Sequence, residues 1–187
     1  MRKIGPWSAG IAVLILLLEL SGFRGSQSIA SPQTSAVSGV TAEVLGVYFT
    51  PPAGAAQAIV KAIDNSQREV LVQAYGFTHN AIAQALLRAS ARGVQVRVLL
   101  DDKSDKTNRY VIDLLNQGQV PLRGDAKHAI AHNKVMVIDE TVVITGSFNF
   151  TNAAETRNAE NFLILKSPEL ARTYKGQWQI HWEHSRE

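Results

Sequence analysis

Residues 132–149, HNKVMVIDETVVITGSFN, decide the fold of this chain. Three of the four apolar residues at 135–138 are β-branched, and such residues favour strands. Side chains two residues apart on a strand project from one face, so His132 and Lys134 should lie side by side. A second apolar run leads to a Gly-Ser-x-Asn segment, whose glycine allows a backbone to approach a ligand closely. The stretch therefore predicts two strands that bring an imidazole and an ammonium next to a loop with a hydroxyl and a carboxamide.

Asp139 lies between the two apolar runs. It falls on the opposite parity from His132 and Lys134, so a regular strand turns its side chain away from theirs. The pair Asp139–Glu140 also fits a turn. We therefore predict that Asp139 anchors the chain and is not the reacting group.

Six positions of the stretch follow the spacing His-x-Lys, four residues, Asp, six residues, Gly-Ser-x-Asn. They are His132, Lys134, Asp139, Gly146, Ser147 and Asn149. This pattern resembles the signature of the phospholipase D superfamily, and six specified positions rarely recur by chance in one short chain. The segment at 158–161, Asn-Ala-Glu-Asn, also resembles the family's downstream Asn-x-Glu-Asn element. The similarity is greatest to the small, single-motif bacterial endonucleases of the family, and it runs from about Val44 to the C-terminus.

The side chains of the motif suit a phosphoryl group, because they supply a nucleophile and donors to the non-bridging oxygens. They call for no metal and no cofactor. The resemblance implies that His132 forms a covalent phosphohistidine, that Lys134, Ser147 and Asn149 bind phosphate oxygens, and that Glu160 orients the histidine. The catalytic set implied by the family is then His132, Lys134, Asp139 and Glu160, in which Asp139 holds the motif in place.

The chain carries one copy of the motif, whereas the family uses a second histidine to protonate the leaving oxygen. The other histidines lack a lysine two residues later; they are His79, His128, His181 and His184. The resemblance therefore implies a homodimer in which His132 of each protomer contributes to one site.

The substrate is less determined than the chemistry, because the same motif serves phosphodiesters of nucleic acids and of phospholipids. Small size and a single motif copy, without an obvious lipid-binding insertion, favour a non-specific endonuclease that acts on DNA, with RNA as a further substrate. A phospholipase D or phosphatidyltransferase acting on head groups is the alternative. A catalytically silent nucleic-acid-binding module is a third, and the complete set of reactive residues speaks against it.

The first 30 residues have the layout of a secretory signal. Arg2 and Lys3 precede an apolar run at 9–18 that is too short for a comfortable membrane span. Cleavage after Ala30 would export the domain to the periplasm or the medium, without stable membrane contact. Because Glu19 and other charges interrupt the pattern, an uncleaved N-terminal anchor is the alternative.

Composition supports one domain after this leader. Residues 31–40 are rich in Ser, Pro and Gly and predict a linker, which leaves 41–187 as the folded unit. The chain has 187 residues, 45% of them hydrophobic, and no cysteine, so disulfides and thiolate metal sites are excluded. Residues 1–30 carry three basic side chains and one acidic one, so the remainder has two positive charges fewer than the chain's +3. Basic residues near the motif form either a local anion-binding face or scattered solvated charges.

The rest of the sequence predicts an α/β fold. Strands are expected at 43–50, 70–77, 94–100, 120–123 and 162–166, with helices at 54–65, 78–91 and 110–117 and from Pro168 onward. Alternation of strand and helix implies right-handed crossovers, so we expect a single-domain α-β-α sandwich with a largely parallel or mixed sheet. Thr78 should cap the second helix, and Asn152 with Glu155 fits a capping box for a short helix after the motif.

Three further patterns have competing interpretations. The acidic segment 101–105 is either a magnesium site or, as we favour, a loop with a helix cap at Ser104 or Asp105. His128 and His132 would chelate a metal on a helix, but the strand formers that follow favour an extended chain. A stripe in the last helix is expected in the core and not as a base-stacking platform; its members are Leu170, Tyr174, Trp178 and Trp182.

Overall fold

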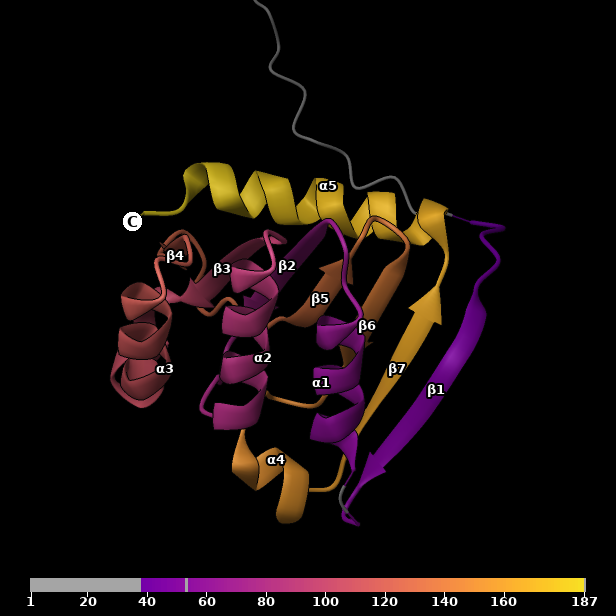
Figure 1. Cartoon of the computed structure of the whole chain (residues 1–187), viewed down its shortest axis with the longest axis horizontal. Coiled ribbons are helices and arrows are strands. Elements are labelled where there is room, and N and C mark those ends of the chain that lie inside the picture. The colour runs from indigo at the N-terminus through magenta and orange to yellow at the C-terminus, as the bar shows by residue number, and fades with distance from the viewer. Residues whose placement is uncertain (1–37, 53, 187) are drawn as a thin grey trace, which may run out of the picture. The chain divides into compact units, whose positions relative to one another are not determined.

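The computed structural model describes residues 38–52 and 54–186 (Figure 1). The signal or anchor predicted at 1–30, and residues 31–37 of the predicted linker, lie outside these residues. Within the described part, no helix is long and apolar enough to cross a membrane.

A seven-stranded sheet in the order β1-β7-β6-β5-β2-β3-β4 forms the centre of the fold. The strands are β1 (Glu43–Thr50), β2 (Glu69–Ala74), β3 (Gln95–Asp101), β4 (Leu122–Asp125), β5 (Lys134–Ile138), β6 (Val142–Gly146) and β7 (Glu160–Lys166). The pairs β2–β3 and β3–β4 are parallel and the other four pairs are antiparallel. The sheet is therefore mixed, which confirms the second of the two sheet types that the sequence predicted. The hairpin of β5 and β6 separates β1 from β2, so β1 pairs with β7 at the far edge.

Helices cover both faces of this sheet, which confirms the α-β-α sandwich (Figure 1). They are α1 (Ala55–Asp64), α2 (Asn80–Ala91), α3 (Asp105–Gln117), the short α4 (Asn152–Thr156) and α5 (Pro168–His184), with a 3₁₀ turn, η1, at Asp102–Ser104. Side chains of one strand parity, such as Val70 and Met136, pack with α1, α2 and α3. Side chains of the other parity, such as Leu71 and Val137, pack with α5.

The aromatic stripe of α5 is part of the core, as predicted. Trp178 is 1% exposed, and its indole Nε1 donates to the carbonyl of Val72 at 2.9 Å. Leu170, Tyr174 and Trp182 pack against the same cluster. Apolar residues that recur every four positions lie on one face of a helix. In α5 that face packs on the sheet, so the stripe is buried.

Several helix starts differ from the prediction. The helix expected at 110–117 begins at Asp105, with Ser104 at its N-cap position, although the Ser104 hydroxyl makes no capping bond. Thr78 is not the cap of α2, because His79 occupies that position and its side chain makes no capping bond. The loop favoured at 101–105 is instead the end of β3, the η1 turn and the first residue of α3. The Asp101 carboxylate accepts from the Lys103 amide at 2.9 Å in this turn.

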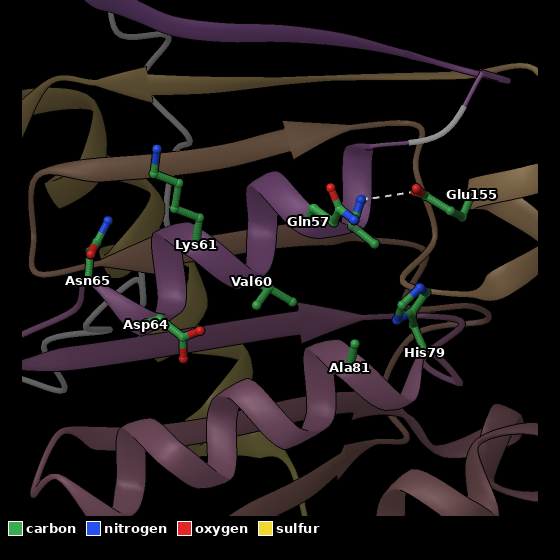
Figure 2. Close-up of a pocket in the computed structure, with 9 residues that line it drawn as sticks. Gln57, Val60, Lys61, Asp64, Asn65, His79, Ala81 and Glu155 are labelled. Carbon is green, nitrogen blue, oxygen red and sulfur yellow. Dashed lines mark hydrogen bonds between the residues drawn. The ribbon is translucent and has the colours of Figure 1, made fainter.

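The capping box predicted for α4 is also wrong. Thr151 is the N-cap, and its hydroxyl accepts from the Ala154 amide at 3.1 Å. The Glu155 carboxylate instead reaches the first turn of α1, where it accepts from the amides of Gly54 at 2.7 Å and Ala56 at 2.9 Å. Figure 2 shows Glu155 pointing toward α1. A buried carboxylate needs donors, and the free amides of a neighbouring helix start supply them.

Candidate active site

The residues of the motif meet in a pocket of about 350 Å³ where β5 begins and β6 ends. Its lining is His132, Lys134, Gly146, Ser147, Asn149 and Glu160. The hairpin places the start of β5 beside the end of β6, with Val135 opposite Thr145, and β7 brings Glu160 alongside. The structure thus brings together every predicted site residue except Asp139.

His132 is exposed at the mouth of this pocket. Two backbone bonds hold its neighbours, because the Ala131 amide donates to the Asp101 carboxylate at 2.6 Å and the Tyr75 amide donates to the Asn133 carbonyl at 3.0 Å. The Tyr75 ring also meets the imidazole edge to face, with 4.8 Å between ring centroids. The imidazole is therefore positioned through its backbone while its ring nitrogens remain accessible to a substrate.

Asp101 and Tyr75 were not identified from the sequence as site residues. Asp101 was considered only as part of an acidic run, and Tyr75 as one residue of a strand. No local signal links either residue to His132, since the sheet order β5-β2-β3 is what brings them together.

Lys134 is buried beneath His132 and supplies the positive charge of the pocket. Its Nζ donates to the His132 carbonyl at 2.8 Å and lies 5.5 Å from the centroid of the Tyr75 ring. Burial lowers the pKa of Lys134, while the nearby Glu160 carboxylate opposes that shift. Because an ammonium has three protons, Lys134 keeps donors for a phosphate oxygen after bonding the carbonyl.

Glu160 is held on the opposite side of the pocket by two donors. The Ser147 hydroxyl donates to Oε2 at 2.6 Å, and the Asn158 amide donates to Oε1 at 3.1 Å. Among the described residues, neither oxygen bonds to His132, so the predicted role of Glu160 in orienting the imidazole stays a prediction. A hydroxyl has one proton, and that of Ser147 is donated to Glu160. Ser147 can therefore donate to a phosphate oxygen only if its bond to Glu160 is broken.

Asn149 and Gly146 complete the Gly-Ser-x-Asn loop. The Asn149 Oδ1 accepts from the Gly76 amide at 3.4 Å, a weak bond that leaves its NH₂ group to donate. At Gly146, a Cβ would lie 2.2 Å from the Asn161 carbonyl oxygen and 2.5 Å from the Phe162 Cα. The close approach of β7 therefore already requires a glycine at this position, while the predicted close approach of a ligand to Gly146 stays a prediction.

Asp139 lies at the other end of β5, in the turn that joins it to β6. Its Oδ1 accepts from the amides of Arg68 at 2.7 Å and Glu69 at 3.0 Å, and its Oδ2 accepts from the Gln67 amide at 2.9 Å. Its φ of 53° and that of Glu140, 56°, suit a type I′ hairpin turn. These contacts agree with the predicted anchoring role, although the family pattern counts Asp139 with the catalytic residues.

The substitution Asp139→Asn should separate these two roles. Asparagine tolerates positive φ, but its NH₂ group cannot accept from a backbone amide, so we expect a loss of about 1–3 kcal/mol in unfolding free energy. Urea unfolding measures that loss, and the rate per folded molecule should stay near the wild-type value. Asp113→Asn, on the exposed face of α3, is the matched control, with an expected effect below about 0.5 kcal/mol. A large fall in rate without loss of stability would instead make Asp139 part of the chemistry.

His128 and His132 do not form the chelating pair considered above. Residues 126–133 are not helical, and the His128 Nδ1 lies 3.0 Å from the Asp125 carboxylate. Two histidines of α5 contact the same carboxylate, His181 at 2.7 Å and His184 at 3.3 Å. Burial alone would raise the pKa of Asp125, but the bonds from these imidazoles hold that pKa well below its usual range.

Comparison with known proteins identifies the family to which this fold belongs. Residues 59–182 match the family model described as "Cardiolipin synthase, PLD-like domain". The chain belongs to the phospholipase D superfamily. The family predicted from the motif is thus confirmed, and the protein is a phosphodiesterase of that superfamily.

Individual relatives agree with this assignment to the phospholipase D superfamily. A protein of Rickettsia conorii named phospholipase D is 42% identical over 142 residues, which cover 76% of this chain and 71% of the relative. The crystal structure of Nuc, a phospholipase D family member from Salmonella typhimurium, superposes with a TM-score of 0.74 at 34% identity, covering 78% of this chain and 97% of Nuc. NucT from Helicobacter pylori superposes with a TM-score of 0.67 at 25% identity, covering 75% and 96% of the two chains.

A second pocket of this phospholipase D-like domain, about 510 Å³ in volume, lies between α1 and α2 (Figure 2). His79 and Glu155 close one end of it, and Asp64 and Asn65 lie at the other. Burial lowers the pKa of His79, although Glu155 opposes the shift. No residue of the motif lines this pocket, so the smaller pocket at His132 is the candidate active site.

Proposed function

We propose that this protein is an endonuclease that hydrolyses DNA through a covalent phosphohistidine, in a site shared by two copies of the chain. The observation that carries the proposal is the pocket at His132, which combines one exposed imidazole with a buried ammonium, a hydroxyl and a carboxamide. These groups match the needs of a phosphodiester, since the imidazole can attack phosphorus and the others can donate to its oxygens.

In the first step a ring nitrogen of His132 attacks phosphorus and forms a P–N bond. The P–O bond to the leaving nucleoside oxygen breaks, and the imidazolium of His132 of the partner subunit gives its proton to that oxygen. Lys134 and Asn149 donate to the non-bridging oxygens and stabilise the charge that develops on them.

In the second step water attacks phosphorus and the P–N bond breaks. His132 of the partner subunit, now neutral, takes the proton of the water and returns to its starting state. One imidazole cannot be both nucleophile and acid in the same step, and among the described residues His132 is the one histidine that lines the pocket. The need for a second imidazole supports a homodimer with a two-fold axis at the site.

A metal-free mechanism is favoured by the charges of the pocket. Lys134 lies beside His132 and Glu160, and its ammonium would repel a divalent cation placed between them. Within the described ranges 38–52 and 54–186, the one gathering of three or more metal-ligating side chains lies elsewhere, around Asp125.

Nucleic acid is supported as the substrate by the lining of the pocket. Five of its six lining residues have polar or charged side chains and the sixth is glycine, so no hydrophobic residue lines it to hold an acyl chain. The similarity of the motif to that of small single-motif endonucleases points the same way. We also propose that the segment at 1–30 directs export to the periplasm or the medium.

A phospholipid-cleaving function is the second candidate, and one observation favours it. Edge strand β1 exposes four apolar side chains to solvent, Val44 by 56%, Leu45 by 48%, Val47 by 52% and Phe49 by 68%. Such an edge suits contact with a lipid surface or with another protein. The relative from Rickettsia conorii also carries the name phospholipase D.

The test presents both substrates to one preparation of the chain from residue 31 onward, in EDTA. We expect supercoiled plasmid to be nicked and then degraded, while vesicles of phosphatidylcholine or cardiolipin remain intact. Hydrolysis of the lipids with intact plasmid would overturn the nuclease proposal in favour of the second candidate. Plasmid binding without cleavage, unchanged by His132→Ala, would indicate a silent binding module. A melting curve in the same buffer distinguishes loss of the fold from loss of the chemistry.

A further inference from the structure

Four metal-ligating side chains converge at the end of the sheet around Asp125, the last residue of β4. His128 follows in the next loop, and His181 and His184 lie three residues apart in the last turn of α5. One potential ligand atom from each of the four residues lies within 4.8 Å of the others. The residues come from two segments, 125–128 and 181–184, that are more than 50 residues apart in the chain, so only the tertiary structure creates the cluster.

The cluster is buried on one side and open on the other. The Asp125 side chain is fully buried, whereas that of His128 is 43% exposed. The His128 and His181 rings stack with centroids 4.7 Å apart, and the His184 ring lies 5.3 Å from His181 and 5.4 Å from His128. Three imidazoles therefore surround one carboxylate, with access for a small ion from the His128 side.

We propose that Asp125, His128, His181 and His184 form a zinc-binding site. The ligand atoms would be the Nδ1 atoms of His128 and His181, the Nε2 of His184 and an oxygen of Asp125. Three imidazoles and one carboxylate supply the four N and O ligands of a closed, tetrahedral structural site. Ligand atoms in such a site lie about 3.4 Å apart. The distances from the imidazole nitrogens to the Asp125 oxygens are slightly shorter than this, and all four ligand atoms lie within 4.8 Å of one another, so small shifts would bring them around one ion.

Zinc explains the composition of the cluster better than hydrogen bonding alone. With hydrogen bonds alone, three ring nitrogens share the two oxygens of one carboxylate, at 2.7, 3.0 and 3.3 Å. One carboxylate balances the charge of one imidazolium, so three imidazoles exceed what a salt bridge needs. A divalent cation would use all four groups at once.

The ion would tie the C-terminal helix to the segment that carries His132. Arg186, two residues beyond His184, already exchanges backbone bonds of 2.7 and 3.1 Å with Gly124, next to Asp125. On the other side, His128 lies four residues before His132 in the same loop. The site is thus structural, and none of its ligands lines the pocket at His132.

Zinc chloride added to EDTA-treated and desalted protein tests the site by calorimetric titration and by thermal unfolding. We expect one ion per chain and, with free zinc at about 100 times the dissociation constant, a rise in melting temperature on the order of 5–10 °C. His181→Gln and His184→Gln should bind zinc at least about 100-fold more weakly. The matched controls His79→Gln and His132→Gln should bind it like the wild type.

Absence of zinc binding by the wild type would overturn the proposal, as would binding that survives in both α5 variants. Loss of binding in His132→Gln would move the ion to the active site and overturn it as well. Should the α5 variants fail to fold, the visible spectrum of the Co²⁺-substituted wild type decides between intense tetrahedral bands, which support the site, and weak octahedral ones, which contradict it. The proposal is independent of the nuclease function, because zinc binding and hydrolysis are measured separately.

Discussion

Replacing His132 by alanine should abolish phosphodiester hydrolysis, with a loss of about 10³- to 10⁶-fold in rate. The imidazole is the nucleophile of the proposed reaction, and no other imidazole of the described chain lines the pocket. Because the His132 side chain is exposed and is not part of the hydrophobic core, its removal should leave the melting temperature unchanged.

The measurement uses an oligonucleotide labelled on the phosphate, and the reaction is quenched during turnover. The wild type should trap label in an acid-labile, base-stable bond, as expected of a phosphoramidate, and His132→Ala should trap none. His79→Ala is the matched control, since His79 is half-buried in the pocket between α1 and α2 and should leave the rate unchanged. Trapped label or near-normal cleavage in His132→Ala would refute a phosphohistidine at this position.

When wild-type and His132→Ala chains are mixed, the activity should be proportional to the square of the fraction of wild-type chains. If each dimer has one site with two histidines, only wild-type homodimers are active, so an equal mixture should retain about a quarter of the activity. A mixture with one wild-type chain in ten should retain about 1%, whereas independent sites would retain about 10%. This tenfold difference makes the dependence on composition a direct test of the shared site.

Subunits must exchange before the assay, which co-expression with two affinity tags ensures. Doubly tagged dimers purified from that mixture should be inactive. A parallel mixture with His79→Ala should show activity proportional to total protein. A linear dependence with His132→Ala would show that one chain suffices for catalysis, and the proposed two-fold site would be wrong.

The hairpin of β5 and β6 is the part of the site that local sequence predicts best. Val135–Ile138 form a strand, and the two-residue spacing of His132 and Lys134 brings both into the pocket. The stripe of α5 is buried, as its four-residue spacing predicted. Each of these features depends on a period of two or about four residues, which the order of the residues contains directly.

Partners far apart in the chain account for the predictions that failed. Glu155 was assigned to its own helix but bonds to Ala56, 99 residues away. The contact of His128 with the Asp125 carboxylate, which His181 also contacts from more than 50 residues further on, was not predicted from the sequence. Short-range patterns cannot choose among such donors, because several satisfy a buried carboxylate equally well and packing selects one.

By itself, the sequence determined the chemistry on offer and the strands that carry it: an imidazole and an ammonium on one strand, followed by a Gly-Ser-x-Asn loop. Tertiary structure alone decided the mixed order of the sheet, the support of His132 by Asp101 and Tyr75, and the gathering of three histidines around Asp125. The physical reason is that the direction of a side chain follows from its position in the repeat of its own strand or helix. Which distant groups meet depends on how the whole sheet buries its two faces.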